Sequence, residues 1–234
     1  MSLPDWLTGQ PVAHRGYHVP GPDCPENSLA ALAAAEQLGY AAEIDVQLSS
    51  DGVVMIFHDR TLDRLCGVPG RLSDRTAGAL QRLRLADGPE TIPNLWDALV
   101  LFPDLPLLIE LKMGDMALAP AVADLLDDHG GPFAVQSFDP EIVGWFADHR
   151  PGWPRGLIAY RRRWFGHRVT EPRFRPEFLE TARPHFVAWS VNDLPVHPSV
   201  PGELPVLTWT VRNARQRHRA GVHARNMIFE GFRA

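Results

Sequence analysis

The sequence has little cysteine and no excess of basic residues. Its two cysteines, Cys24 and Cys66, lie far apart and form no Cys-x-x-Cys motif. This usage indicates a reducing compartment and excludes a disulfide scaffold. The formal net charge is −5, from 23 basic and 28 acidic residues, which argues against a nucleic-acid-binding protein. We therefore expect no nucleic-acid partner.

The sequence also lacks the patterns of membrane insertion. No stretch approaches the ~18 consecutive apolar residues of a membrane-spanning helix, and residues 1–6 show no basic segment leading into an apolar one. We expect a cytoplasmic protein without a stable membrane anchor. There is no internal repeat, and the 22 prolines are spread along the chain rather than gathered in a linker. These features predict a single domain over residues 1–234.

Residues 41–57 predict a β-hairpin. Two apolar, β-branched segments lie on either side of Asp51-Gly52, the dipeptide that most strongly favours a two-residue turn. With that turn, Asp45 is expected directly opposite His58. Glu43 should share their face, because side chains alternate along a strand.

The predicted cluster of Glu43, Asp45 and His58 needs an explanation. One alternative is a solvated face of the hairpin. The apolar residues around the cluster favour burial instead, and buried carboxylates need a compensating charge. Hard oxygen ligands suit Mg²⁺ or Ca²⁺ rather than zinc. We therefore predict a divalent cation as cofactor.

Apolar segments and helical segments alternate along the rest of the chain. The predicted parallel strands begin near residues 11, 42, 106, 133, 155, 185, 205 and 226. Eight strands that alternate with helices predict a TIM-type (β/α)8 barrel of the α/β class, and the chain length suits one. We expect the barrel to be somewhat irregular, with the β-hairpin and an insertion over the rim at residues 59–93, both after the second strand.

Polar side chains recur where these strands end. In such a barrel all strands open with their C-terminal ends on one rim. Glu110 and Lys112 share a face because one residue separates them, although a simple ion pair is the alternative. The residues expected at this rim are His14, Arg15, Glu43, Asp45, His58, Glu110, Lys112, Gln136, Ser137 and Trp209. Their convergence predicts an active site.

These segments resemble the glycerophosphodiester phosphodiesterase family, in its bacterial, cytoplasmic type. The resemblance is carried by Ala13-His-Arg-Gly16, Pro25-Glu-Asn-Ser28, Glu43-Ile-Asp-Val46, Asp51-Gly52, His58-Asp59, Ile92-Pro93, Ile109-Glu-Leu-Lys112, Ser137-Phe138 and Trp209-Thr-Val211. It implies a metal-dependent hydrolase of lipid and glycerol metabolism, which converts glycerophosphodiesters to glycerol 3-phosphate and an alcohol.

The resemblance also implies roles for single residues. Glu43, Asp45 and Glu110 are implied as metal ligands, His14 and His58 as the acid–base pair, and Arg15 and Lys112 as phosphate ligands. Gln136, Ser137 and Trp209 are expected to contact the substrate. The sequence departs from the family pattern at Arg212 and Glu230, which puts the shape of the alcohol pocket in question.

Several alternatives remain at this stage. One histidine could deprotonate the glycerol hydroxyl to form a cyclic phosphate, or water could attack phosphorus directly, and either histidine could act first as the base. The substrate could instead be a lysophospholipid, for which the basic, aromatic residues 161–165 would be a landing surface. A catalytically silent barrel that binds a phosphate ester is a third possibility, which the paired histidines disfavour.

Overall fold

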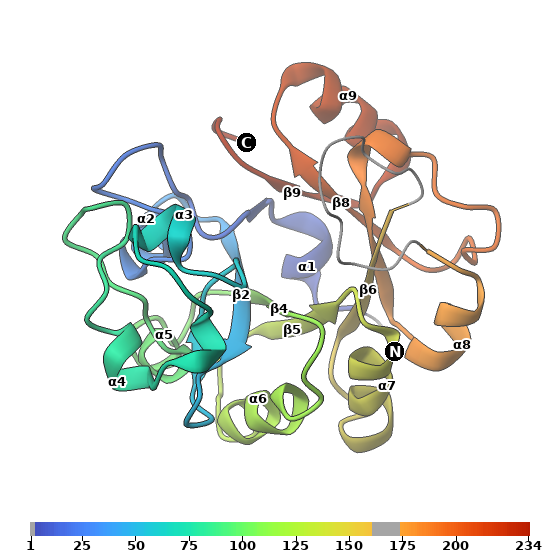
Figure 1. Cartoon of the computed structure of the whole chain (residues 1–234). Helices are drawn as coiled ribbons and strands as arrows, with labels where there is room; N and C mark the ends of the chain where they lie inside the picture. Colours follow the sequence, from blue (N-terminus) through green and yellow to red (C-terminus); the bar gives the residue numbers. More distant parts are fainter. Residues whose placement is uncertain (1–2, 161–173) are drawn as a thin grey trace. The chain divides into compact units, whose positions relative to one another are not determined.

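The computed structural model describes residues 3–160 and 174–234, and strands and helices alternate along most of that chain (Figure 1). The strands are β1 (Val12–Ala13), β2 (Ala41–Leu48), β3 (Val54–Ile56), β4 (Leu107–Leu111), β5 (Phe133–Ser137), β6 (Arg155–Ala159), β7 (Phe186–Ser190), β8 (Val206–Val211) and β9 (Asn226–Phe229).

The helices are short, as expected for connections between barrel strands. They are α1 (Asp5–Gly9), α2 (Leu29–Gln37), α3 (Asp63–Cys66), α4 (Ala77–Leu80), α5 (Leu95–Leu101), α6 (Leu118–Leu126), α7 (Pro140–His149), α8 (Glu177–Ala182) and α9 (Ala214–His223), with 3₁₀ turns η1 (Leu72–Asp74) and η2 (Val191–Asp193). Among the described residues, no helix has the length and apolar character needed to cross a membrane.

The strand order in the sheet is β1-β9-β8-β7-β6-β5-β4-β2-β3, and β1 also pairs with β2. β3 is a return strand that pairs antiparallel with β2, so eight of the strands in the described residues remain for the barrel. This order confirms the predicted TIM-type fold and the hairpin after its second strand.

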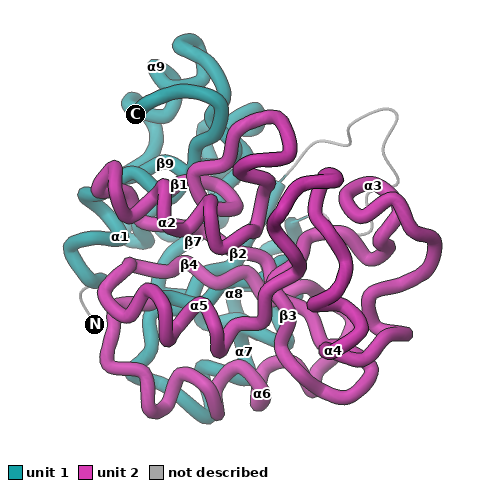
Figure 2. The backbone as a smooth tube through the Cα atoms, turned by 90° about the vertical axis from the view of Figure 1, so that its left-hand side faces the viewer, with its two compact units in different colours: residues 1–12, 134–234 teal, residues 13–133 magenta. Residues whose placement is uncertain are grey.

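The chain divides into two compact units, which are coloured separately in Figure 2. One unit is residues 13–133, in which β2 pairs in parallel with β4 and antiparallel with β3. The other unit is residues 1–12 with 134–234, in which β6, β7, β8 and β9 pair in parallel in chain order. Each unit has its own buried strands, because parallel strands are covered on both faces.

The hairpin register differs from the prediction by one residue. The observed pairs are Val46 with Ile56 and Leu48 with Val54, whereas the predicted turn would place Asp45 opposite His58. The loop has three residues because the Ser49 hydroxyl accepts a hydrogen bond from Val53 N at 2.9 Å, while the Ser49 carbonyl accepts from Gly52 N at 3.1 Å. The left-handed glycine, at φ +80°, suits a three-residue hairpin loop rather than a two-residue one.

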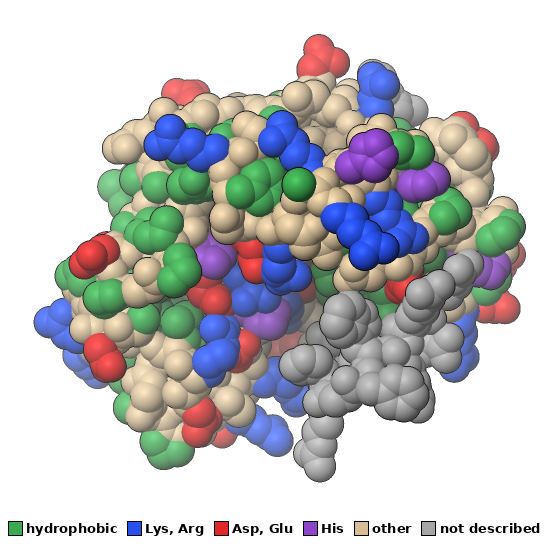
Figure 3. Space-filling view, turned by 90° about the horizontal axis from the view of Figure 1, so that it is seen from above, with side chains coloured by type: hydrophobic (Ala, Val, Ile, Leu, Met, Phe, Trp, Pro, Cys, Tyr) green, Lys and Arg blue, Asp and Glu red, His purple; other side chains and the backbone are tan. Residues whose placement is uncertain are grey.

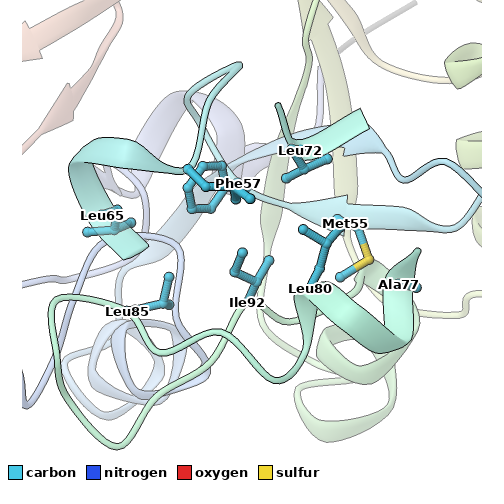
Figure 4. Packing of buried hydrophobic residues seen from close by; sticks show 9 residues of the cluster. Met55, Phe57, Leu65, Leu72, Ala77, Leu80, Leu85 and Ile92 are labelled. Carbon is cyan, nitrogen blue, oxygen red and sulfur yellow. The ribbon is translucent and has the colours of Figure 1, made fainter. Parts of the chain in front are cut away.

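The insertion (residues 59–93) contains α3, η1 and α4 and has a small core of its own. Figure 4 shows its apolar side chains gathered against the return strand of the hairpin. Phe57 is 1% exposed and Met55, Leu72 and Leu80 are fully buried. Burial of this kind contributes roughly 1.5–3 kcal/mol per large side chain, so the insertion is a packed element.

Residue type agrees with the helix boundary at two N-termini, but a glycine near the end of a third helix does not stop it. Ser28 caps α2 by accepting a hydrogen bond from Ala31 N at 3.1 Å, and Asn94 caps α5 in the same way. Serine and asparagine are among the residue types that favour this position. Gly221, a residue type that often follows a helix, lies inside α9, which continues to His223. Glycine lowers helix propensity by only about 1 kcal/mol, which neighbouring turns can offset.

Candidate active site

Three carboxylates meet between β2 and β4. The parallel register pairs Asp45 directly with Glu110, and Glu43 lies two residues earlier on the same face of β2. Their ligating oxygens all lie within 4.8 Å of one another. Because Glu43 and Asp45 are 1% exposed and Glu110 is 8% exposed, this is a buried acidic cluster, as the sequence predicted.

Two cations contact the acidic cluster. Lys112 Nζ lies 2.7 Å from Asp45 Oδ1 and 2.5 Å from Glu110 Oε1, and Arg15 Nε lies 3.3 Å from Asp45 Oδ2. Burial by itself would lower the pKa of Lys112, but the two carboxylates raise it above its usual range. The ammonium group therefore stays protonated at neutral pH.

The three carboxylates differ in how readily they ionise. Burial, then repulsion from Asp45 and Glu110, raises the pKa of Glu43 well above its usual range. Burial also raises the pKa of Glu110, although Lys112 opposes it. Burial opposes ionisation of Asp45 as well, but Lys112 and His58 hold the pKa of Asp45 well below its usual range. If all three carboxylates are ionised, the cluster carries one negative charge more than Lys112 and Arg15 supply. Its all-oxygen donor set fits a hard divalent cation, which would favour that ionised form.

The loop after β1 is shaped by a left-handed turn. Arg15 has φ +56°, and its backbone N donates to Glu43 Oε2 at 3.0 Å. Gly16 follows at φ +73°, and a Cβ there would lie 2.7 Å from that of Ala31 on α2. Glycine is therefore required where the loop approaches the helix. This close approach explains the glycine of the His-Arg-Gly motif.

Asn27 contacts the acidic cluster, although no sequence pattern marked it as a site residue. It is 1% exposed and has φ +57°. Its side-chain Nδ2 donates to Asp45 Oδ2 at 2.8 Å, and its Oδ1 accepts from Asp45 N at 3.2 Å. Asparagine tolerates the left-handed conformation better than most residues. Its place in the Pro-Glu-Asn-Ser motif, directly before a helix, was the available signal.

His58 is brought to the cluster despite the shifted register. Its Nδ1 lies 2.7 Å from Asp59 Oδ1. Gln47 Nε2 lies 2.7, 3.2 and 2.9 Å from the carbonyl oxygens of Phe57, His58 and Asp59. The backbone of this turn is thus held by Gln47, and the imidazole by Asp59. The charges of both His58 and His14 act on Asp45, so the predicted histidine pair shares one electrostatic environment with the cluster.

A second group of charged residues adjoins the site. Arg64 on α3 donates from Nε to Asp59 Oδ2 at 2.6 Å and from its two terminal nitrogens to Glu26 at 2.7 and 2.9 Å. Glu26 also lies 2.6 Å from Arg15 Nη1. Burial opposes ionisation of Glu26, but Arg64 and Arg15 lower its pKa to about 2. Figure 3 views the molecule from above and shows acidic, basic and histidine side chains side by side in one area of the surface.

The predicted substrate residues of β5 and β8 belong to the other unit. Gln136 and Ser137 are buried at the end of β5. Trp209 Nε1 donates to Ala188 O at 2.8 Å, and its ring packs edge-on to Phe138 at 5.5 Å between centroids. These contacts fix the indole in the fold of its own unit. Substrate contact by these three residues stays a prediction.

The two departures from the family pattern contact each other. Arg212 Nε donates to the carboxylate of Glu230. The two positions at which this sequence departs from the family pattern are therefore joined by an ion pair. Residues 161–165, the alternative lipid-landing surface, lie outside the described residues.

Comparison with known proteins gives the family. The model of the glycerophosphoryl diester phosphodiesterase family matches residues 14–225, so the chain belongs to that family. It is 38% identical over 147 residues to mouse glycerophosphodiester phosphodiesterase 1, covering 56% of this chain and 43% of the mouse protein. It is 34% identical over 124 residues to a Caldanaerobacter subterraneus glycerophosphodiester phosphodiesterase, 49% of each chain. The chain thus spans less than half the length of these relatives.

A solved structure supports the fold. A phosphodiesterase from Oleispira antarctica, determined in complex with the product sn-glycerol-3-phosphate, superposes with a TM-score of 0.78 at 24% identity. The match covers 94% of this chain and 92% of that one. This likeness agrees with the TIM-type barrel seen in the strand order.

Proposed function

We propose that this protein hydrolyses glycerophosphodiesters to glycerol 3-phosphate and an alcohol, with the help of a divalent cation. The observation that carries the proposal is the buried cluster of Glu43, Asp45 and Glu110, with Arg15 and Lys112 against it. A site for an anionic diester needs concentrated positive charge. Family membership and the names of the relatives support the reaction class.

Glu43, Asp45 and Glu110 would hold the cation, which we propose to be Mg²⁺ or Ca²⁺. The fit rests on their shared burial and on the mutual repulsion that raises the pKa of Glu43. When bound, the cation would neutralise phosphate charge as a Lewis acid. Arg15 and Lys112 would bind the phosphate oxygens, the first through a planar fork and the second as a compact charge.

His14 and His58 would move the protons. One takes the proton from the glycerol hydroxyl next to the phosphate, and the hydroxyl oxygen then bonds to phosphorus. The other gives its proton to the departing alkoxide as the P–O bond breaks. The resulting cyclic phosphate is opened by water with the two roles reversed. Because Nδ1 of His58 is held by Asp59, Nε2 is the atom available for transfer.

The first experiment measures release of glycerol 3-phosphate from glycerophosphocholine, glycerophosphoethanolamine and glycerophosphoglycerol, with Mg²⁺, with Ca²⁺ and with EDTA. We expect metal-dependent release that EDTA abolishes. His58→Ala should lower kcat by about 10²–10⁴-fold, as expected for loss of a general acid–base group. His218→Gln, at an exposed position of α9, serves as the matched control.

Two outcomes would redirect the proposal. Absence of release from every diester, with release from lysolipid micelles, would assign a phospholipid substrate. Undiminished turnover in His58→Ala would remove that histidine from the mechanism. A rise in Tm with added Mg²⁺ or Ca²⁺, absent in Glu43→Gln but present in Glu36→Gln on the exposed side of α2, would test the metal ligands without any activity assay.

A further inference from the structure

Arg64 joins two carboxylates that come from different parts of the chain. Its Nε donates to Asp59, next to the hairpin, at 2.6 Å, and its two terminal nitrogens donate to both oxygens of Glu26, ahead of α2, at 2.7 and 2.9 Å. Three guanidinium nitrogens are thus used in a fork geometry that only arginine provides.

Each of these carboxylates has a second partner in the proposed site. Asp59 Oδ1 lies 2.7 Å from His58 Nδ1, and Glu26 Oε1 lies 2.6 Å from Arg15 Nη1. The result is one continuous chain of alternating charge, from the imidazole at one end to the phosphate-binding guanidinium at the other. Arg64 is its central link.

We propose that Arg64 is a positioning residue, which fixes the His58 ring through Asp59 and the Arg15 side chain through Glu26. The proposal rests on the proposed function, because it assigns a role toward the proton-transfer and phosphate-binding groups. A carboxylate at Nδ1 selects the imidazole tautomer and orientation. Arg64 in turn holds that carboxylate in place.

The surroundings of Arg64 suit this role. It lies on α3, between Leu62 and Leu65, which pack into the core of the insertion and are 0% and 9% exposed. Its side chain is 49% exposed, but the carboxylates it holds are only 13% and 23% exposed. The packed insertion therefore supplies a fixed cation to the site. Its hydrophobic core would serve to hold Arg64 in place.

Steady-state kinetics on glycerophosphocholine test the proposal. We expect Arg64→Gln to lower kcat/KM by about 10–100-fold, the usual loss when a residue that supports a ligand is removed. The kcat should fall because the His58 ring is no longer fixed, and KM should rise because the Arg15 side chain is no longer fixed. Arg64→Lys keeps the charge without the fork and should recover only part of the loss. Arg82→Gln, at an exposed position of the same insertion, is the matched control and should behave as wild type.

A double-mutant cycle adds a second test. If Arg64 acts on His58 through Asp59, the loss of kcat in Asp59→Asn with Arg64→Gln should be well below the product of the single losses. Multiplicative losses would show that the two residues act separately and would overturn the proposed route.

The ¹⁵N shifts of the His58 ring give a readout independent of turnover. In the wild type we expect the Nδ1–H tautomer, and in Arg64→Gln a mixture of tautomers. Unchanged shifts and unchanged kcat with a lowered Tm would overturn the proposal and leave Arg64 as a structural clamp. If Arg64→Gln does not fold, Arg64→Lys decides by the same readouts. A wild type without diesterase activity would refute the proposed function, while the tautomer shift would still test the link to His58.

Discussion

Lys112 is the only lysine of a chain whose other basic residues are all arginines. It lies between Asp45 and Glu110, both buried. A compact ammonium with rotatable donors can contact both carboxylates at once, whereas a guanidinium is planar and larger. The one position where the chain uses lysine is thus the one where a point charge is needed.

We expect Lys112→Met to destabilise the metal-free protein by roughly 3–5 kcal/mol, because it leaves a buried carboxylate without its partner. Urea unfolding measures the change. Saturating Mg²⁺ or Ca²⁺ should recover part of the lost stability, since either cation neutralises the same carboxylates. Equal stability of the variant and the wild type without metal would show that the lysine does not compensate the cluster.

Asn27 combines a strained backbone with a buried amide. We expect Asn27→Gly to cost roughly 1–3 kcal/mol, because it leaves Asp45 polar atoms unsatisfied. Asn27→Ala should cost about 1–2 kcal/mol more, because alanine tolerates φ +57° less well than glycine. Urea unfolding of the two variants separates the cost of the lost hydrogen bonds from the cost of the backbone strain. Equal losses in the two variants would show that backbone strain plays no part.

At the scale of elements, the insertion is held by its own core. We expect Leu80→Ala to destabilise the protein by roughly 2–5 kcal/mol, as for other fully buried leucines. Hydrogen exchange should accelerate first over residues 62–92. Val100→Ala, at a position on α5 that is 57% exposed, should change stability by less than about 0.5 kcal/mol. Uniform acceleration over all strands would contradict a separate core.

The hairpin shows how local hydrogen bonds override a turn signal. Asp51-Gly52 correctly located the loop. The hydrogen bonds that the Ser49 hydroxyl and carbonyl accept make the loop one residue longer than predicted. Asp51 also accepts a hydrogen bond from Ala77 N at 2.8 Å, at the start of α4. The register was therefore decided partly by the insertion, which no local pattern in residues 41–57 could indicate.

For the whole molecule, the depressed pKa of Glu26 sets an acid limit of stability. Its folded-state value of about 2 lies below the ordinary 4.5, so the ionised form stabilises the fold above about pH 4.5. This contribution, on the order of 2–3 kcal/mol, is lost as pH falls from about 4.5 toward 2. Urea unfolding between pH 7 and pH 3 should show the decline, and Glu26→Gln should flatten it. An equal decline in the variant would assign it to other carboxylates.

The fold was predictable because apolar and polar residues alternate along the chain with the local periods of strands and helices. Eight apolar segments separated by helical ones indicate parallel strands wherever they occur, and their C-terminal ends bring polar residues together. Glu43, Asp45, Glu110 and Lys112 were found in this way, since alternation along β2 and β4 already assigns them to one face. Residue type then indicated the chemistry, because carboxylate oxygens suit a hard cation.

Only the tertiary structure decided the contacts between residues that lie far apart in the sequence. The amide of Asn27 against Asp45, and the fork of Arg64 between Asp59 and Glu26, depend on how α2 and the insertion pack against β2 and β3. No periodicity records such contacts, because they arise when separate segments are packed together. The sequence thus determined the strands and the acidic cluster, whereas packing decided the hairpin register and which side chains hold the site in place.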